Sequence, residues 1–194
     1  MLADLLAHPG VEEVCELRSR FGILAFHGGN LEKGTDQIAA AAAERAGASL
    51  YAVLQPPDLR WHVPSVAFDP RHSSALAAFL DHVDVAVAVH GYGRDGQWTT
   101  LLLGGSNRSL ASSLGAELRS RLDGFTIVDD LDSVPPELRG VHPRNPINRV
   151  RSGGVQLELP PRVRSGTGAP TYQPAYEAAV VDALAAAALT APAG

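Results

Sequence analysis

The sequence predicts an α/β fold: a single-domain, three-layer sandwich in which a mixed sheet is flanked by helices. Three observations predict it. The 194 residues suit one compact domain with a real hydrophobic core. Apolar residues make up 45% and charged residues 19% of the chain, which excludes a disordered or fibrous protein. Short apolar runs alternate with helix-like stretches, without an internal repeat or a domain boundary, so residues 1–194 are expected to form one domain.

The first half of the chain opens with an apolar run, Phe21–Phe26, that ends at Gly28-Gly29 and is typical of a buried strand followed by a loop. Thr35 is suited to cap an alanine-rich helix over Gln37–Ala46, which Gly47 closes. The other elements expected here are strands over Ser49–Leu54 and Val83–Val89, an extended segment over Trp61–Phe68, and a helix from Ser73 to His82.

The second half continues the alternation. A helix is expected from Asn107 to Leu122, because leucines at four-residue spacing form one apolar stripe. Residues 129–153 combine prolines, glycines and polar residues without a period, which predicts a long loop of the kind that often carries function. The other expected elements are strands over Thr99–Leu103, Phe125–Val128 and Val155–Leu159, and a closing C-terminal helix over 172–189.

Composition excludes several function classes. The net charge of −5 argues against nucleic-acid binding, and the longest apolar stretches are too short to cross a membrane. Residues 1–10 lack the basic region of a secretory signal, so a cytoplasmic location is expected. Cys15 is the one cysteine, so neither an internal disulfide nor a cysteine zinc site is possible. A metal would have to bind to histidine, aspartate and glutamate.

Basic residues gather in one region of this acidic chain. From Arg139 to Arg164 the sequence has six arginines and a single acid, Glu158. Such a segment indicates either a binding place for an anionic ligand or a solvated arginine-rich loop, and the residues alone leave both open.

Two histidines stand directly after apolar strands, at positions where α/β sheets bind ligands. His27 and His90 are each followed by glycine, which leaves space beside the imidazole. Glu32 lies five residues beyond His27, so a turn can bring its carboxylate back toward the same point. Two imidazoles and a carboxylate are the ligands of hydrolytic zinc sites. A hydrogen-bonded structural role for the histidines is the alternative.

A zinc hydrolase also needs a general base, and Glu158 is the best candidate. Strand alternation places Gln156 and Glu158 on the face opposite Val155, Leu157 and Leu159, where Glu158 points either into a cleft or simply into solvent.

Two further segments are candidates for substrate binding. Asn148 and Arg149 can together hold a carboxylate, although asparagine side chains also stabilise loops. His62, in an extended segment, can line a cleft. The chain has neither a phosphate-binding loop nor a serine nucleophile elbow, which disfavours a nucleophilic hydrolase.

Several segments together resemble the poly-γ-glutamate hydrolase family, best known from bacteriophages. They cover most of a motif-bearing core at residues 21–164, in the family's order. The segments are His-Gly-Gly-Asn-Leu-Glu-Lys-Gly-Thr (27–35), Ser-Leu-Tyr (49–51), Val-His-Gly-Tyr (89–92), Leu-Gly-Gly-Ser-Asn (103–107), Asn-Pro-Ile-Asn-Arg (145–149) and Gly-Val-Gln-Leu-Glu-Leu (154–159).

The resemblance implies a compact, zinc-carboxypeptidase-like fold with one zinc ion, Zn2+. It implies that His27, Glu32 and His90 bind the metal and that Glu158 is the catalytic acid/base. It further implies that Asn148 and Arg149 hold a carboxylate of an anionic polyglutamate substrate, whose γ-amide bonds the protein hydrolyses. The sequence departs from the family at Lys33, where proline is common, and in His-Val-Pro-Ser at 62–65, where the family tends toward His-Ile-Thr-Ser.

Two other functions fit the same residues. One is a zinc hydrolase acting on another γ-glutamyl or N-acyl amino acid amide by the same mechanism. The other is a non-catalytic binding module, which would need a lost base or ligand, whereas this chain has all four key residues.

Overall fold

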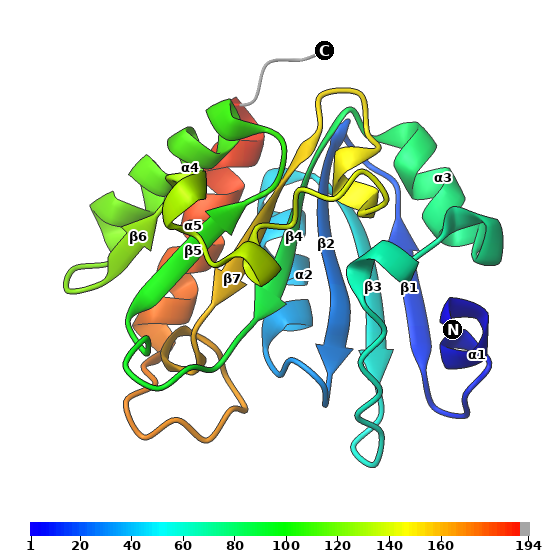
Figure 1. Ribbon diagram of the computed structural model, residues 1–194, viewed down its shortest axis with the longest axis horizontal. Helices are drawn as coiled ribbons and strands as arrows, with labels where there is room; N and C mark the ends of the chain where they lie inside the picture. Colours follow the sequence, from blue (N-terminus) through cyan, green and yellow to red (C-terminus); the bar gives the residue numbers. More distant parts are fainter. Residues whose placement is uncertain (191–194) are drawn as a thin grey trace.

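The computed structural model describes residues 1–190 as a three-layer α/β sandwich built on one seven-stranded mixed sheet (Figure 1). The predicted fold class is confirmed. The strands are β1 Glu12–Glu16, β2 Phe21–Gly29, β3 Ser49–Gln55, β4 Val85–Gly91, β5 Thr100–Gly104, β6 Thr126–Val128 and β7 Gly154–Leu159. The helices are α1 Leu2–Leu6, α2 Thr35–Ala46, α3 Ser74–His82, α4 Arg108–Arg121 and α5 Pro174–Thr190. The last four residues of the expected single domain, 191–194, lie outside the described part.

The strand order of the sheet is β1-β3-β2-β4-β7-β5-β6. The four central strands, β3, β2, β4 and β7, run parallel to one another, whereas β1 and β5 are antiparallel to their neighbours β3 and β7. The carboxyl ends of β2, β4 and β7 therefore meet at one edge, where α/β sheets bind their ligands. His90 and Glu158 are register partners across β4 and β7.

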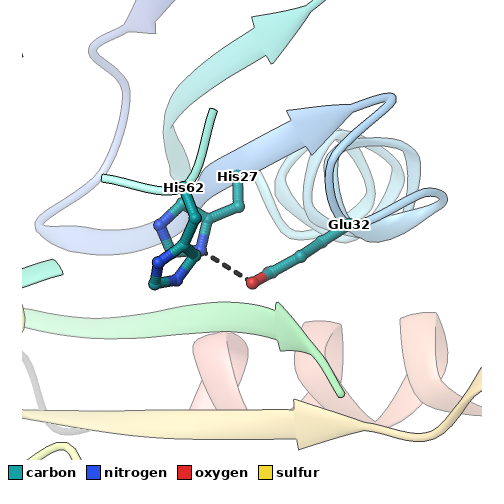
Figure 2. A group of neighbouring side chains, drawn as sticks. All are labelled: His27, Glu32 and His62. Carbon is teal, nitrogen blue, oxygen red and sulfur yellow. Dashed lines mark hydrogen bonds and ion pairs between the residues drawn. The ribbon is translucent and has the colours of Figure 1, made fainter. Parts of the chain in front are cut away.

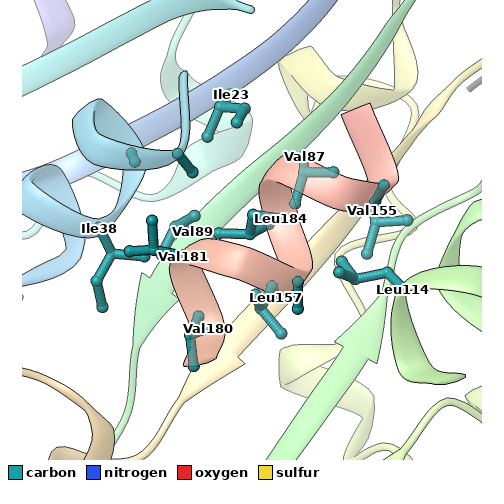
Figure 3. Packing of buried hydrophobic residues seen from close by; sticks show 14 of the residues in the cluster. Ile23, Ile38, Val87, Val89, Leu114, Val155, Leu157, Val180, Val181 and Leu184 are labelled. Atoms are coloured by element: carbon teal, nitrogen blue, oxygen red, sulfur yellow. The ribbon is translucent and has the colours of Figure 1, made fainter. Parts of the chain in front are cut away.

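The two faces of the sheet are covered by different helices. Helices α2, α4 and α5 pack on one face, where sheet residues such as Val87 and Leu157 meet Leu184 of α5 (Figure 3). Burial of each such side chain stabilises the fold by about 1.5–3 kcal/mol. Helices α1 and α3 cover the other face, around Phe26 and Phe68. The candidate site opens on this second face.

The N-terminal region differs from the sequence expectation. Helix α1 and strand β1 were not predicted. Strand β1 carries three glutamates in five residues and shows no apolar alternation, so its sequence does not indicate a strand. It is a charged edge strand, paired on one side with β3.

Smaller corrections concern helix ends and one loop. Thr35 is the first residue of α2 and not its cap; Gly34, with φ of 85°, occupies the cap position. The expected extended segment at 61–68 contains a short 3-10 turn at Ser65–Ala67. The closing helix begins at Pro174, whose fixed φ suits a first helical turn. Within residues 1–190, no helix has both the length and the apolar character that a membrane crossing requires.

Candidate metal centre and catalytic cavity

Three predicted site residues lie at the carboxyl ends of neighbouring strands: His27 on β2, His90 on β4 and Glu158 on β7. Their exposed fractions are 2%, 3% and 4%, so all three are almost fully buried. His90 and Glu158 reach the same face by strand alternation, since their neighbours Val89 and Leu157 pack into the opposite core.

His27 reaches that face through an irregularity in β2. The register with β3 shifts between Ala25 and Gly28, so that three steps on β2 match two on β3. Simple alternation would turn His27 toward the core that contains Ala25. The extra residue re-aims its imidazole toward Phe68 on the other face, with ring centroids 5.9 Å apart.

Glu32 turns back toward both histidines, as its spacing predicted. Its backbone N–H donates to the His27 carbonyl at 2.8 Å, which closes the turn after β2. Its carboxylate oxygens lie 2.8 Å from His27 Nδ1 and 3.4 Å from His90 Nδ1, and the Gly91 N–H donates to it at 2.9 Å. One carboxylate thus faces both imidazoles.

The donor set fits a metal ion. His27 Nε2 lies 2.8 Å from the carbonyl oxygen of Val63, which accepts only from an N–H. In the neutral imidazole, the Nδ1 lone pair then faces a Glu32 oxygen, and a cation between these two atoms would satisfy both. His90 Nε2 is buried without a hydrogen-bond partner in the described part of the chain. Imidazole and carboxylate are ligands that zinc accepts.

His62 approaches the same point from the loop after β3 (Figure 2). One ligand atom each of His27, Glu32 and His62 lie within 4.8 Å of one another. His62 is exposed, whereas His90 is buried on a strand. Partial burial and the nearby His27 lower the pKa of His62. The structure therefore offers two imidazoles as the third ligand, and the assignment of His90 stays a prediction.

The two carboxyl groups of the site have opposite electrostatic environments. Burial raises the pKa of Glu158, and the negative charge of Glu32 adds to that rise. Burial opposes ionisation of Glu32 too, but His90 and His27 outweigh it and hold the pKa of Glu32 well below its usual range. Opposed shifts of this kind separate a permanently ionised group from one that can carry a proton.

Glu158 is held in place by a short chain of amide side chains. Gln156 Nε2 donates to Glu158 Oε1 at 2.8 Å, and Asn145 Nδ2 donates to Gln156 Oε1 at 3.0 Å. Asn145 comes from the long loop predicted at 129–153, so this loop orients the carboxyl group at the end of β7.

These residues line a cavity of about 740 Å³, here called the metal cavity. The long loop forms one wall, with Leu138 and His142 among its residues, and His62 and Pro64 form another. The acids that line it are Glu32, Glu137 and Glu158, and none of its lining residues within 1–190 is lysine or arginine.

Asn148 and Arg149 do not line the metal cavity. Asn148 instead fastens the long loop: its Oδ1 accepts from the Ser106 N–H at 3.1 Å, and its Nδ2 donates to the carbonyls of Gly140 and His142. Arg149 is exposed. Their predicted contact with a substrate carboxylate stays a prediction that this geometry does not support.

Arg164 is a site residue that sequence reasoning missed. Its buried guanidinium donates to the carbonyls of Leu159 at 3.1 Å, Lys33 at 2.7 Å and Tyr92 at 3.4 Å. Leu159 and Lys33 each follow a site glutamate, and Tyr92 lies two residues after His90. Arg164 thus ties the three segments that carry the site together.

The position of Arg164 also explains a glycine. A Cβ atom at Gly91 would lie 2.5 Å from the guanidinium carbon, so only glycine fits after His90. Burial lowers the pKa of Arg164, and the charges of Glu32 and Glu158 oppose that change. The glycine that follows His90 was a visible signal of close packing, but the sequence did not reveal its partner.

A family model described as poly-gamma-glutamate hydrolase matches residues 5–167. The chain belongs to this family of hydrolases. Two relatives from Bacillus subtilis (strain 168), the SPbeta prophage-derived UPF0714 protein YoqZ and the UPF0714 protein YndL, are 32% and 27% identical to it over 139 residues. Each match covers 71% of this chain but 47% of YoqZ and 52% of YndL, so the chain spans about half the length of these curated relatives.

Solved structures share the fold of this family member. A bacteriophage poly-gamma-glutamate hydrolase superposes with a TM-score of 0.76 and 24% identity, covering 95% of this chain and 91% of that one. YndL in an apo, zinc-free form superposes with a TM-score of 0.72 and 23% identity, covering 91% of this chain and 88% of that one. N-formylglutamate amidohydrolase from Ralstonia eutropha JMP134 superposes with a TM-score of 0.58 and 13% identity, covering 91% of this chain and 95% of that one.

Proposed function

We propose that this protein is a zinc-dependent amidohydrolase that cleaves the γ-glutamyl amide bonds of poly-γ-glutamate. One observation carries the proposal: the Glu32 carboxylate faces the imidazoles of His27 and His90 beside a second, protonatable carboxyl group, Glu158. Membership of the poly-gamma-glutamate hydrolase family supports the reaction class and the substrate. The similar protein YndL has been solved in an apo form identified as zinc-free, which supports zinc as the metal.

His27, Glu32 and His90 would hold the metal. His90 is preferred to His62 because it is buried at the end of a strand and its Nδ1 faces the Glu32 carboxylate, so its position is fixed before the metal binds. His62 is exposed at the mouth of the same cavity, which suits contact with substrate.

Bound zinc would lower the pKa of a coordinated water to about 7 and polarise the substrate carbonyl. Glu158 takes the proton from the attacking water and delivers it to the leaving amine, which becomes the new amino terminus. A raised pKa makes the Glu158 carboxylate a better proton acceptor than a solvent-exposed glutamate, and the same group can then return the proton. The hydrogen bond from Gln156 keeps the Glu158 carboxyl group oriented throughout both proton transfers.

Other amides stay open as substrates. Another γ-glutamyl or N-acyl amino acid amide would use the same four residues, so only a substrate panel separates these functions. A non-catalytic binding module is disfavoured, because His27, Glu32, His90 and Glu158 converge on one cavity. The cytoplasmic location expected from residues 1–10 stays a prediction.

The test is release of amino termini from poly-γ-glutamate by the purified protein, before and after chelation and after zinc is restored. Amino termini should appear with zinc, disappear with chelator and return with added zinc, while α-linked polyglutamate is left intact. If the zinc-loaded protein releases none from the γ-linked polymer, the substrate is wrong. Turnover that survives complete chelation would exclude the metal mechanism.

A further inference from the structure

A second cavity, of about 320 Å³, adjoins the metal cavity and shares Leu31 with it. Lys33, Arg60 and Arg164 line this cationic cavity, together with Trp98 and the segment at 161–169. None of its lining residues within the described chain is acidic.

Two of these cations are available to a ligand. Lys33 is the one lysine of the chain, and its side chain, like that of Arg60, is exposed. Neither side chain makes a hydrogen bond or ion pair with any other residue in 1–190. Arg164, in contrast, uses its N–H groups on backbone carbonyls.

Both free cations are attached to the metal site through the chain. Lys33 directly follows Glu32, and Arg164 fixes the Lys33 backbone through its carbonyl. Arg60 lies two residues before His62. A chain that leaves the metal cavity past Leu31 therefore meets two cations, of which Lys33 has its backbone held by Arg164.

We propose that the cationic cavity binds an α-carboxylate of a γ-glutamyl chain, at a residue beyond the bond that is cut; this rests on the proposed function. A γ-linked polymer carries one free carboxylate per residue. The metal cavity presents three acids and no lysine or arginine, so cationic recognition of the polymer has to come from beside it. Trp98, 41% exposed, offers an apolar surface for the methylene groups between carboxylates.

The direct test is binding of a fluorescein-labelled γ-linked glutamate decamer to zinc-loaded Glu158→Gln protein, followed by fluorescence anisotropy. In that background, Lys33→Gln with Arg60→Gln should weaken binding about tenfold and remove much of its salt dependence, because two exposed charge pairs are lost. The charge-retaining pair Lys33→Arg with Arg60→Lys should bind almost as the parent does.

A charge-matched control separates local contact from net charge. Arg45→Gln with Arg121→Gln removes the same charge from exposed positions that line neither cavity and are already paired with acids. This control should change decamer binding less than twofold.

Because Lys33 is the one lysine, acetylation gives an independent test. Acetic anhydride would neutralise only Lys33 and the amino terminus, and the same treatment of Lys33→Gln protein controls for the terminus. Acetylation should weaken decamer binding in the parent and leave it unchanged in that variant.

The outcomes distinguish the inference from the proposed function. Equal decamer binding by parent and Lys33/Arg60 variant would overturn the inference, while cleavage of poly-γ-glutamate would still support the function. An equal loss in the charge-matched control would overturn it as well, since net charge alone would then explain the effect. A decamer that does not bind even the parent would also overturn it, and the chelation assay would then judge the function separately.

Discussion

The two cavities that meet at Leu31 differ in charge, in burial and in how their side chains are held. In the metal cavity, His27, His90 and Glu158 are almost fully buried and fixed by strands and hydrogen bonds. In the cationic cavity, Lys33 and Arg60 are exposed, and neither side chain is paired with an acid in the described range. Rigid acids and imidazoles suit bond cleavage, whereas adaptable cations suit recognition of an acidic chain.

The sharpest test of this division removes the proposed base. Glu158→Gln should lower kcat by about 10²–10⁴-fold, because an amide cannot accept and return a proton. Zinc content, measured by elemental analysis, should not change. Glu137→Gln is the matched control, since Glu137 lines the same cavity but is exposed and paired with Arg94 at 2.6 Å. A large loss in the control, or full activity in Glu158→Gln, would place the base elsewhere.

The metal ligands can be separated by comparing two imidazoles. His90→Ala should weaken zinc binding by more than about a hundredfold, because it removes a direct ligand and not only its support. His62→Ala should keep near-parental zinc affinity and raise KM for the polymer. Competition with a fluorescent chelator measures both affinities. The reverse order would make His62 the third ligand.

Arg164 lines the cationic cavity and also donates hydrogen bonds to the backbone of the segments that carry the metal-cavity residues. Arg164→Met should leave three carbonyls without their donor and lower the free energy of unfolding by about 3 kcal/mol. Because these carbonyls belong to the segments that carry Glu32, His90 and Glu158, zinc affinity should fall about tenfold as well.

Arg162→Met is the control for this positioning role. The Arg162 guanidinium stacks 5.3 Å from the ring centroids of Phe125 and Tyr176, away from the metal cavity. Its loss should cost stability without changing zinc affinity. Equal effects of the two variants on zinc affinity would mean that Arg164 acts only through general stability.

The smallest predicted effect is a pair of opposite stability changes in the metal-free protein. The pKa of Glu158 is raised in the folded protein, so ionisation of this group destabilises the fold as pH rises above the pKa that Glu158 has in the unfolded chain. Glu158→Gln should therefore raise Tm at pH 7 but not at pH 4. The pKa of Glu32 is lowered in the folded protein, so the ionised group stabilises the fold at pH values above its pKa in the unfolded chain, and this stabilisation is lost as pH falls. Glu32→Gln should therefore lower Tm at pH 7. Each kcal/mol corresponds to about 2–4 °C in thermal melts.

Much of the fold could be predicted because its signals are local. The apolar runs that form β2, β4 and β7, and the leucine stripe of α4, match the periods of strand and helix. Strand β1 could not be predicted in the same way, because its five residues are mostly charged and it gains order only by pairing with β3.

In the candidate site too, features set by local sequence could be predicted, whereas features set by contacts between distant segments could not. Strand-end histidines and the turn to Glu32 are readable from spacing, and the structure brings them together. The shift in β2 that aims His27, and the burial of Arg164 against Gly91, depend on contacts between distant segments. Arg149 looked suited to a carboxylate from its neighbours in sequence, yet it lies outside both cavities.

The proposed metal centre on His27, Glu32 and His90 can be located by anomalous diffraction at the zinc edge from crystals grown with zinc. We predict one strong peak at coordination distance, about 2.0–2.2 Å, from a nitrogen of His27, a nitrogen of His90 and a Glu32 oxygen, with His62 farther away. A peak coordinated by His62 in place of His90, or no peak in this cavity, would contradict it.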